Sequence, residues 1–463
     1  MTEEPSGSGS GSSTSTAGET TPLRTYQDLL TNRVDEAQFE HFFTSQLMRV
    51  DLEGKTTPLG KPGIVASHSA SPDGNWILVQ ALEGPWSYAV PWWRFGHRLE
   101  AWPTTGGEPV AVAKNPLAEE VPIQGVITGP RRMEWQPLEA ATLVWAEALD
   151  DGDPRKEAEY RDKVLRLAAP FTGEATPFDQ TEHRYSGIDW LESKGQYFIR
   201  DYDRDRRWIR SRWRDLARPD FDKTVFDRSY QDRYADPGRL VYRTLEDGHD
   251  VVRVQDGKVF LDGDGATDKG DRPFLDAMTL ETLEKERLFH APEDEYARFV
   301  AFSGGTDNFV VRRESPDAPP NYFLHPKTGE EKALTEFPHP YPQLKGIEKQ
   351  LLTYKRKDGV PLSGTLYLPP DRKPDEKLPL VILNGVIINV AIGIALHLSL
   401  TGQTDAYLNP ADHSILVAIA TPVLSGVWYH VALYYWHRTL HHPKLYRYVH
   451  HVHHKYKAPM FLD

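Results

Sequence analysis

The chain has 463 residues, enough for two or three domains. Hydrophobic residues make up 39% of it, which supplies a large core and excludes a chain that is disordered throughout. Cysteine is absent, so disulfide bonds, cysteine-ligated zinc and a thiol nucleophile are excluded. The net charge of -13 argues against nucleic acid as a partner of the whole chain.

Charge and histidine are unevenly distributed along the chain. Residues 384–463 carry a balance of +2 and ten of the 18 histidines, whereas residues 1–383 carry -15. The first 22 residues are rich in Ser, Gly and Thr, which predicts a disordered tail. They have neither the basic start nor the apolar stretch of a secretory signal. We therefore expect a tail followed by two unlike parts.

Residues 25–350 show short apolar segments separated by turn residues. Ser71–Gly74 has the composition of a tight turn, and the buried-strand sequence Trp76–Val79 follows it. Trp135 and Trp190, which stand in related units, are 55 residues apart, and Phe302 follows 112 residues later. This recurrence predicts a mainly β fold, a β-propeller of six or seven four-stranded blades. An irregular pair of all-β sandwiches is the alternative.

A charge-rich stretch, Asp201–Arg218, interrupts this pattern. Its alternating charges and two tryptophans are compatible with a nucleic-acid surface. The acidic surroundings favour a solvated strand edge, in which arginine stems cover the aromatic rings.

Two uncharged stretches follow, residues 378–404 and 415–436. Each is long enough to span a bilayer, and aromatic residues gather at the end of the second. Asn384, Asn389 and His397 leave a buried soluble segment as the alternative for the first stretch. Basic residues flank both stretches on the outside, so we expect a helical membrane hairpin with the propeller facing the cytosol.

Seven segments of the first part of the chain form a recognisable set: Thr25–Leu30, Asp35–Glu40, Val90–Phe95, Pro316–Tyr322, Phe337–Gln343, Tyr354–Leu362 and Gly364–Pro370. Together they resemble the glutamyl endopeptidase-like branch of the prolyl oligopeptidase serine peptidases. The resemblance implies an N-terminal propeller that restricts access to an α/β-hydrolase domain, and it makes residues 351–383 the opening strands of a truncated hydrolase. A peptide is the ligand expected in the propeller.

The nucleophile of such a peptidase stands in a Gly-x-Ser-x-Gly elbow. The sequence contains no such motif, so no catalytic residue is assigned. Ser303 lies between Phe302 and two glycines, where an ordinary turn serine is expected.

The last segment contains closely spaced histidines. An H-x₃-H pair places His437 and His441 one helical turn apart, and an H-x₂-H-H pattern adds His450, His453 and His454. Neutral imidazoles suit iron, zinc, copper or nickel. The alternative is a solvated basic cluster at a membrane surface.

These histidine motifs resemble those of the sterol desaturase/fatty acid hydroxylase family. The resemblance covers residues 385–463 and implies membrane enzymes whose histidine-ligated di-iron site activates O₂. By motif, the iron ligands are His437, His441, His450, His453 and His454. His442 and His451 would be ligands or hydrogen-bond partners of ligands.

The family has a further histidine cluster after more membrane-embedded chain. This sequence ends at Asp463, so we expect a partial site with at most one weakly held iron in a partial hydroxylase-like domain at 384–463. The leading hypothesis is a non-catalytic peptidase propeller tethered to a lipid membrane. The alternative is a metal-dependent membrane oxidoreductase completed by another chain, and a serine peptidase is the third.

Overall fold

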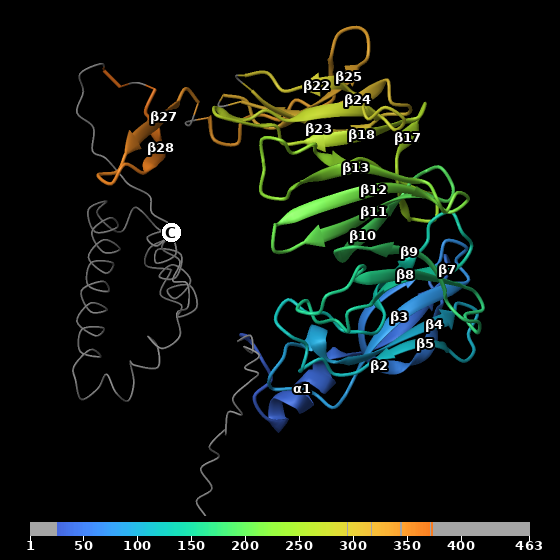
Figure 1. The fold of residues 1–463 in the computed structure, drawn as a ribbon. Coiled ribbons are helices and arrows are strands. Elements are labelled where there is room, and N and C mark those ends of the chain that lie inside the picture. Colours follow the sequence, from blue (N-terminus) through green and yellow to red (C-terminus); the bar gives the residue numbers. More distant parts are fainter. Residues whose placement is uncertain (1–25, 294, 316, 343–344, 371, 374–463) are drawn as a thin grey trace, which may run out of the picture. The chain divides into compact units, whose positions relative to one another are not determined.

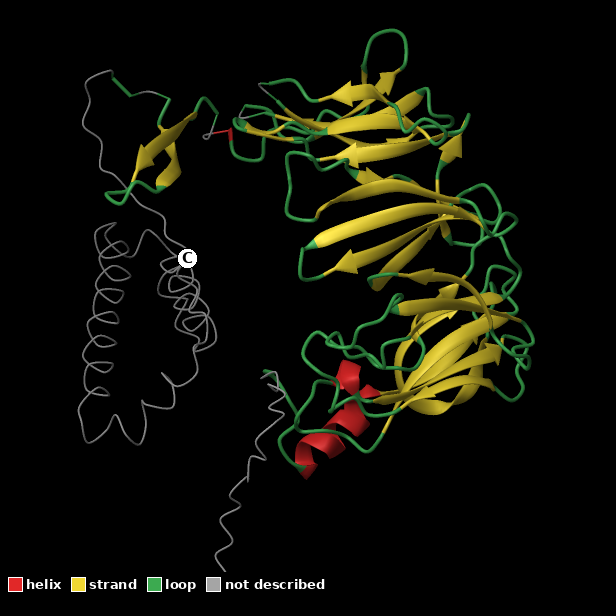
Figure 2. Cartoon of the chain, viewed as in Figure 1, coloured by secondary structure: helices red, strands yellow, loops and turns green. Residues whose placement is uncertain are grey.

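The computed structural model describes residues 26–293, 295–315, 317–342, 345–370 and 372–373. The chain divides into two units, residues 1–370 and 371–463, and nearly all described residues belong to the first. They form one α-helix, one short 3₁₀-helix and 28 strands, all paired antiparallel within their sheets (Figures 1 and 2). The mainly β prediction is confirmed for this part of the chain.

Helix α1 (Arg33–Phe43) precedes the sheets. The Asn32 side chain caps it by accepting two backbone N–H groups of the first turn, and Asp35 favours the positive end of the helix dipole. Phe39 meets the rings of Trp86 and Phe95 edge-on, with centroids 5.2 and 5.8 Å away. These contacts attach the helix to the loop beside the first sheet.

The first sheet has five strands in sequential order. The predicted turn is confirmed: the Gly74 N–H donates to the Ser71 carbonyl at 2.9 Å, and Gly74 has a φ of 68°, which glycine adopts without strain. The 3₁₀-helix η1 (Trp92–Arg94) lies before the fourth strand. The strands are β1 (Thr44–Val50), β2 (Thr56–Ala70), β3 (Trp76–Glu83), β4 (Gly96–Pro103) and β5 (Val110–Asn115).

The second and third sheets have four strands each, again in sequential order. The strands predicted beside Trp135 and Trp190 are confirmed. The second sheet comprises β6 (Arg131–Trp135), β7 (Thr142–Ala148), β8 (Asp162–Ala168) and β9 (Thr176–Thr181). The third comprises β10 (Arg184–Trp190), β11 (Gln196–Asp203), β12 (Trp208–Asp215) and β13 (Asp222–Ser229).

The fourth sheet is less regular, and two short ladders accompany it. It contains β14 (Arg239–Leu240), β17 (Val254–Gln255), β18 (Lys258–Gly263), β21 (Phe274–Thr279) and β22 (Lys285–His290). The ladders pair β15 (Tyr242–Thr244) with β16 (Asp250–Val252), and β19 (Ala266–Thr267) with β20 (Gly270–Asp271). The fifth sheet contains β23 (Tyr296–Phe302), β24 (Asn308–Glu314), β25 (Asn321–Pro326) and β26 (Lys332–Ala333).

Consecutive sheets pack face to face, and each interface has its own hydrophobic core. Between the first and second sheets, Leu78 and Ala101 pack with Leu143 and Leu165. Further cores join the second sheet to the third, the third to the fourth and the fourth to the fifth. Figure 1 shows the resulting stack of sheets in chain order. This is the blade-on-blade packing of a propeller-like fold.

The described residues form five sheets of four or five strands, fewer than the six or seven blades predicted. The recurrence near Trp135 and Trp190 is real, but the predicted number of blades assumed that every stretch of about 50 residues forms one blade. Some of those residues lie instead in helix α1, in the 15-residue strand β2 and in the connection between β5 and β6. No hydrophobic core of the described residues joins the fifth sheet to the first, so ring closure stays a prediction.

Strands β27 (Glu348–Lys355) and β28 (Pro361–Leu368) form a separate antiparallel hairpin. Its turn contains Gly359, with a φ of 88°. The hairpin lies in the segment predicted to open a hydrolase domain at 351–383, and that assignment stays a prediction. Residues 374–383 lie outside the described part of the chain.

The charge-rich stretch is an interior strand rather than the edge that was predicted. Strand β12 lies between β11 and β13, and its arginines pair with acids from neighbouring strands. Arg210 contacts Asp201 at 2.7 Å, and Arg214 contacts Asp179 at 3.0 Å. Because these cations are already neutralised, β12 offers no basic surface to a nucleic acid.

Both predicted membrane spans, 378–404 and 415–436, lie outside the described residues, as does the 1–22 tail. In the part of the chain that the structure describes, neither helix has the length and apolarity needed to cross a bilayer. The membrane hairpin, its lipid partner and the cytosolic orientation therefore stay predictions.

A buried ion network connects the second and third sheets. Asp162 is fully buried on β8, where its carboxylate contacts Arg131 and pairs with Arg184 at 2.8 Å. It also accepts the Tyr185 backbone N–H at 2.7 Å. Arg184 continues the network to Asp150 at 2.6 Å. The lone pairs of both buried carboxylates are thereby occupied.

We predict that Asp162→Ala lowers the free energy of unfolding by about 3–5 kcal/mol, because two guanidinium groups lose a buried counter-ion. Lys163→Ala, on the same strand but partly exposed, is the matched control and should change stability by less than about 1 kcal/mol. Urea unfolding of the full chain followed by tryptophan fluorescence measures both. Equal effects of the two substitutions would contradict the role assigned to the network.

Candidate functional site

Strands β2, β6 and β10, called here the lead strands, each carry an irregularity opposite the next strand. The register shifts between Val65 and Ser67 in β2, between Arg131 and Glu134 in β6, and between Tyr185 and Gly187 in β10. A β-bulge bends its strand and turns side chains out of the regular alternation. Similar shifts occur in other strands of the sheets. In the lead strands they give side chains directions outside the regular alternation.

In β6 the bulge presents two unpaired charges. Arg132 has a φ of 52°, in the left-handed region that is costly for a residue with a side chain. Both Arg132 and Glu134 are exposed, and neither side chain makes an ion pair or hydrogen bond with another described residue. This pair of free charges is therefore available to a ligand.

In β10 the bulge holds a buried carboxylate. Asp189 is 6% exposed; Arg200 of β11 contacts it at 2.8 and 3.1 Å, and the Tyr242 hydroxyl donates to it at 2.7 Å. Gly187 permits this arrangement, because a Cβ there would lie 2.9 Å from an Arg200 nitrogen and its φ is 150°. The glycine therefore positions the arginine over the acid.

The carboxyl groups of Glu134 and Asp189 both have raised pKa values, but their surroundings differ. Burial raises the pKa of Glu134 to about 7, the nearby Asp189 adds to the rise, and Arg132 and Arg200 oppose it. Glu134 stays accessible to solvent, but the protein atoms around its carboxyl group limit hydration. Burial also raises the pKa of Asp189, against the attraction of Arg200. Glu134 is thus an acid that changes its charge near neutral pH.

These residues surround a cavity of about 240 Å³ between the lead strands and the β15–β16 ladder. Glu134, Asp189 and Asp250 bring carboxylates to it, and Trp135, Trp190 and Tyr242 bring aromatic rings. The other lining residues are Ser69, Pro137, Ile188 and His249. An apolar cavity with a few convergent polar groups is the usual form of a small binding site.

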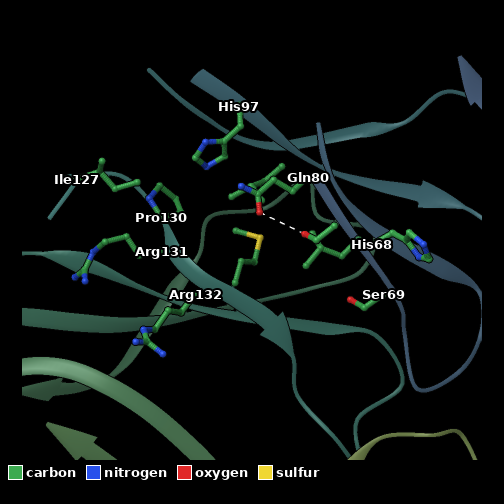
Figure 3. Close-up of a pocket in the computed structure, with 12 residues that line it drawn as sticks. His68, Ser69, Gln80, His97, Ile127, Pro130, Arg131 and Arg132 are labelled. Atoms are coloured by element: carbon green, nitrogen blue, oxygen red, sulfur yellow. Dashed lines mark hydrogen bonds between the residues drawn. The ribbon is translucent and has the colours of Figure 1, made fainter. Parts of the chain in front are cut away.

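A second cavity, of about 380 Å³, lies between the first sheet and β6 (Figure 3). The His97 Nδ1–H donates to the Phe95 carbonyl at 3.1 Å, because the Asn115 amide donates to Nε2 at 2.9 Å. Figure 3 shows the side chains of Arg131 and Arg132 extending away from the side where Gln80 lies. The cavity wall mixes apolar and polar side chains, and Arg132 is among its lining residues.

The sequence missed Glu134 and Asp189, although a signal for them is present. Each acid directly precedes the tryptophan that marks its sheet, as Glu134-Trp135 and Asp189-Trp190. The tryptophans were used only as markers of a recurring unit, and both are buried. The acid beside each one faces the cavity. A recurring acid–tryptophan pair was therefore the sequence signature of this site.

The residues singled out from the sequence lie elsewhere. Ser303 follows β23 in a turn, where its N–H donates to the Asn308 carbonyl at 2.9 Å, as expected for a turn serine. No group of three or more metal-ligating side chains occurs among the described residues. The predicted iron ligands His437, His441, His450, His453 and His454 fall outside the described residues, so the structure does not test them.

Comparison with known proteins shows what the first part of the chain is similar to. A probable chloroplastic glutamyl endopeptidase of Oryza sativa subsp. japonica is 34% identical over 384 residues, and one of Arabidopsis thaliana is 33% identical over 385. This part of the chain is therefore homologous to part of these glutamyl endopeptidases. The alignments take in 78% of the chain but only 41% and 40% of the relatives, so the chain spans about two fifths of their length.

Solved peptidase structures are less similar to this chain in sequence. Porphyromonas gingivalis dipeptidyl peptidase 4 shares 12% identity over 73% of this chain and 55% of its own, with a TM-score of 0.42. A puromycin hydrolase mutant shares 16% sequence identity over 72% of this chain and 48% of its own, with a TM-score of 0.40. No protein-family model matches the chain. The endopeptidase relatives give no test of the resemblance of residues 385–463 to sterol desaturases, which stays a prediction.

We predict that Glu134→Gln alters the pH dependence of stability. A pKa raised from 4.5 to about 7 means that the folded state holds a proton which the unfolded state releases. The associated stability is present below pH 4.5 and is lost as the pH rises through 7. The glutamine of the variant cannot ionise. The free energy of unfolding of the variant should therefore rise relative to that of the parent between pH 4.5 and 7, by about 1 kcal/mol after solvent screening.

Urea unfolding at a series of pH values measures this difference. Glu108→Gln is the control, because Glu108 is an exposed residue in the connection between β4 and β5. Parallel stability curves for the parent and Glu134→Gln would contradict the raised pKa.

Proposed function

We propose that residues 26–370 act as the propeller module of a prolyl oligopeptidase-type serine peptidase, and that this module binds peptides on its lead-strand surface. The observation that carries the proposal is the alignment with glutamyl endopeptidases over 78% of the chain. The lead strands support it, because they gather the free charges and two cavities on one part of the stack. The module binds without hydrolysing, since the sequence has no nucleophile elbow.

The relatives are named glutamyl endopeptidases, so we propose peptides that contain glutamate as the ligands. Arg132 is suited to a glutamate carboxylate, because its guanidinium has five N–H donors and no internal acceptor among the described residues. Its position in the wall of the 380 Å³ cavity leaves space for the rest of a peptide. A charge-assisted contact of this kind contributes about 1.5–3 kcal/mol.

We predict that a fluorescein-labelled peptide with a central glutamate binds the full chain saturably in fluorescence anisotropy. Arg132→Gln should weaken its binding about tenfold or more, because the carboxylate loses its cation. Lys61→Gln is the matched control, since Lys61 is an exposed cation on β2 outside both cavities.

The same sample should remain unlabelled by a fluorophosphonate serine-hydrolase probe. Stoichiometric labelling of any serine, Ser303 included, would contradict the non-catalytic assignment. Absence of saturable peptide binding would contradict the peptide-binding function.

A second candidate function belongs to residues 384–463 and is carried by the histidine spacing. We propose that this segment tethers the propeller to a lipid membrane and binds one iron through His437, His441, His450, His453 and His454. Two motifs, H-x₃-H and H-x₂-H-H, supply imidazoles at helical spacing. In the family that it resembles, iron supplies oxygen activation. An iron-dependent lipid oxidoreductase would follow if another chain supplied the missing ligands.

We predict that the full chain, purified in detergent, retains at most about one iron per chain by inductively coupled plasma mass spectrometry. His441→Ala combined with His453→Ala should abolish retention, and retention should fall below about pH 6.5, because imidazole binds metal only when neutral. The control is His413→Ala combined with His430→Ala, which removes histidines outside both motifs.

Either of two outcomes would overturn this assignment. Two tightly bound irons would show a complete site and favour the oxidoreductase. The absence of iron between pH 7 and 8 would show that the histidines do not form a metal site.

A further inference from the structure

The 240 Å³ cavity has an unbalanced charge. Three carboxylates line it, from Glu134, Asp189 and Asp250, and no lysine or arginine is among its lining residues. Asp189 is neutralised by Arg200, and Asp250 accepts the Thr244 hydroxyl at 2.6 Å. The Glu134 side chain makes no ion pair or hydrogen bond in the described part of the chain, and only longer-range attraction from Arg132 and Arg200 acts on its charge. The cavity therefore presents one carboxylate without a direct counter-ion.

A second, independent observation comes from the indole groups. The Trp135 Nε1–H donates to the Ser69 carbonyl at 3.0 Å. Trp190, which is 5% exposed and lines the same cavity, has a buried Nε1–H with no hydrogen-bond partner in the structure. A buried donor without an acceptor is costly and rare in native proteins. A ligand that brings an acceptor would satisfy it.

The ligand must therefore carry both a cation and a hydrogen-bond acceptor. A bare metal ion fits poorly, because no described group of three or more His, Asp or Glu side chains is arranged to hold one. A simple amine brings the cation but no carbonyl. A peptide with a lysine or arginine brings a charged group, a carbonyl acceptor and an aliphatic stem. Such a stem packs well on aromatic rings like those of Trp135 and Tyr242.

We propose that this cavity binds a lysine or arginine side chain of a peptide, with the Glu134 carboxylate as its counter-ion. The inference rests on the proposed peptide-binding function and names a second determinant beside Arg132. Arg132 and Glu134 stand two residues apart on β6 with opposite charges. The module would thus bind both an acidic and a basic side chain of one peptide. A bound cation would lower the raised pKa of Glu134, because it favours the ionised form of the carboxyl group.

The test compares three fluorescein-labelled peptides of equal length at pH 8, where Glu134 is mostly ionised. One peptide has a central lysine, one has acetyl-lysine and one has glutamate, each flanked by glycines. Fluorescence anisotropy with the full chain gives the affinities. We expect Glu134→Gln to weaken the lysine peptide about tenfold or more and to leave the acetyl-lysine peptide unchanged. Glu108→Gln, with an exposed carboxylate outside both cavities, should change neither.

The outcomes separate this inference from the proposed function. If the glutamate peptide binds but the lysine and acetyl-lysine peptides bind equally, or Glu134→Gln has no effect on the lysine peptide, the cavity assignment is wrong and the peptide-binding function stands. If none of the three peptides binds, the proposed function itself fails. An unchanged circular dichroism spectrum of Glu134→Gln establishes that the variant is folded.

Discussion

The structure depends on strands that are buried on both faces. In β7, Leu143 and Trp145 pack against the first sheet, whereas Val144 and Ala146 pack against the third. The same alternation recurs in β11 and β18, whose successive side chains belong to different interfaces. Burial of each large apolar side chain stabilises the fold by about 1.5–3 kcal/mol. The segments of these strands that lie between two sheets are therefore apolar on both faces, and they hold the sheets in a stack.

This constraint determines where function can reside. A strand whose two faces are both buried has no side chain left for a ligand. The lead strands have only one neighbour within their sheets or carry a bulge, and there the backbone can turn a polar group away from the core. Glu134 and Asp189 stand at these positions, each beside a buried tryptophan. The same local sequence thus contributes one residue to the core and the next to the cavity.

The parts of the fold that depend on local chemistry could be predicted from the sequence. The turn Ser71–Gly74 and the apolar strands after it follow from composition alone, and so does the mainly β class. The number of sheets could not be predicted, because loops and helix α1 use chain without a periodic signal. The interior position of β12 could not be predicted either, because the acids that neutralise its arginines come from other strands. The site required knowledge of register: Asp189 and Arg200 meet across two strands only because Gly187 leaves space, and no pattern in one sequence shows that contact.

Photo-crosslinking measures most directly whether peptides bind on the lead strands. A glutamate peptide carrying benzoylphenylalanine would be irradiated with the full chain, and the crosslinked residues would be located by mass spectrometry. The account predicts crosslinks within residues 131–137, 186–190 and 242–250, all suppressed by excess unlabelled peptide. Saturable crosslinks confined to the outer strands β9 and β13, with none on the lead strands, would contradict it.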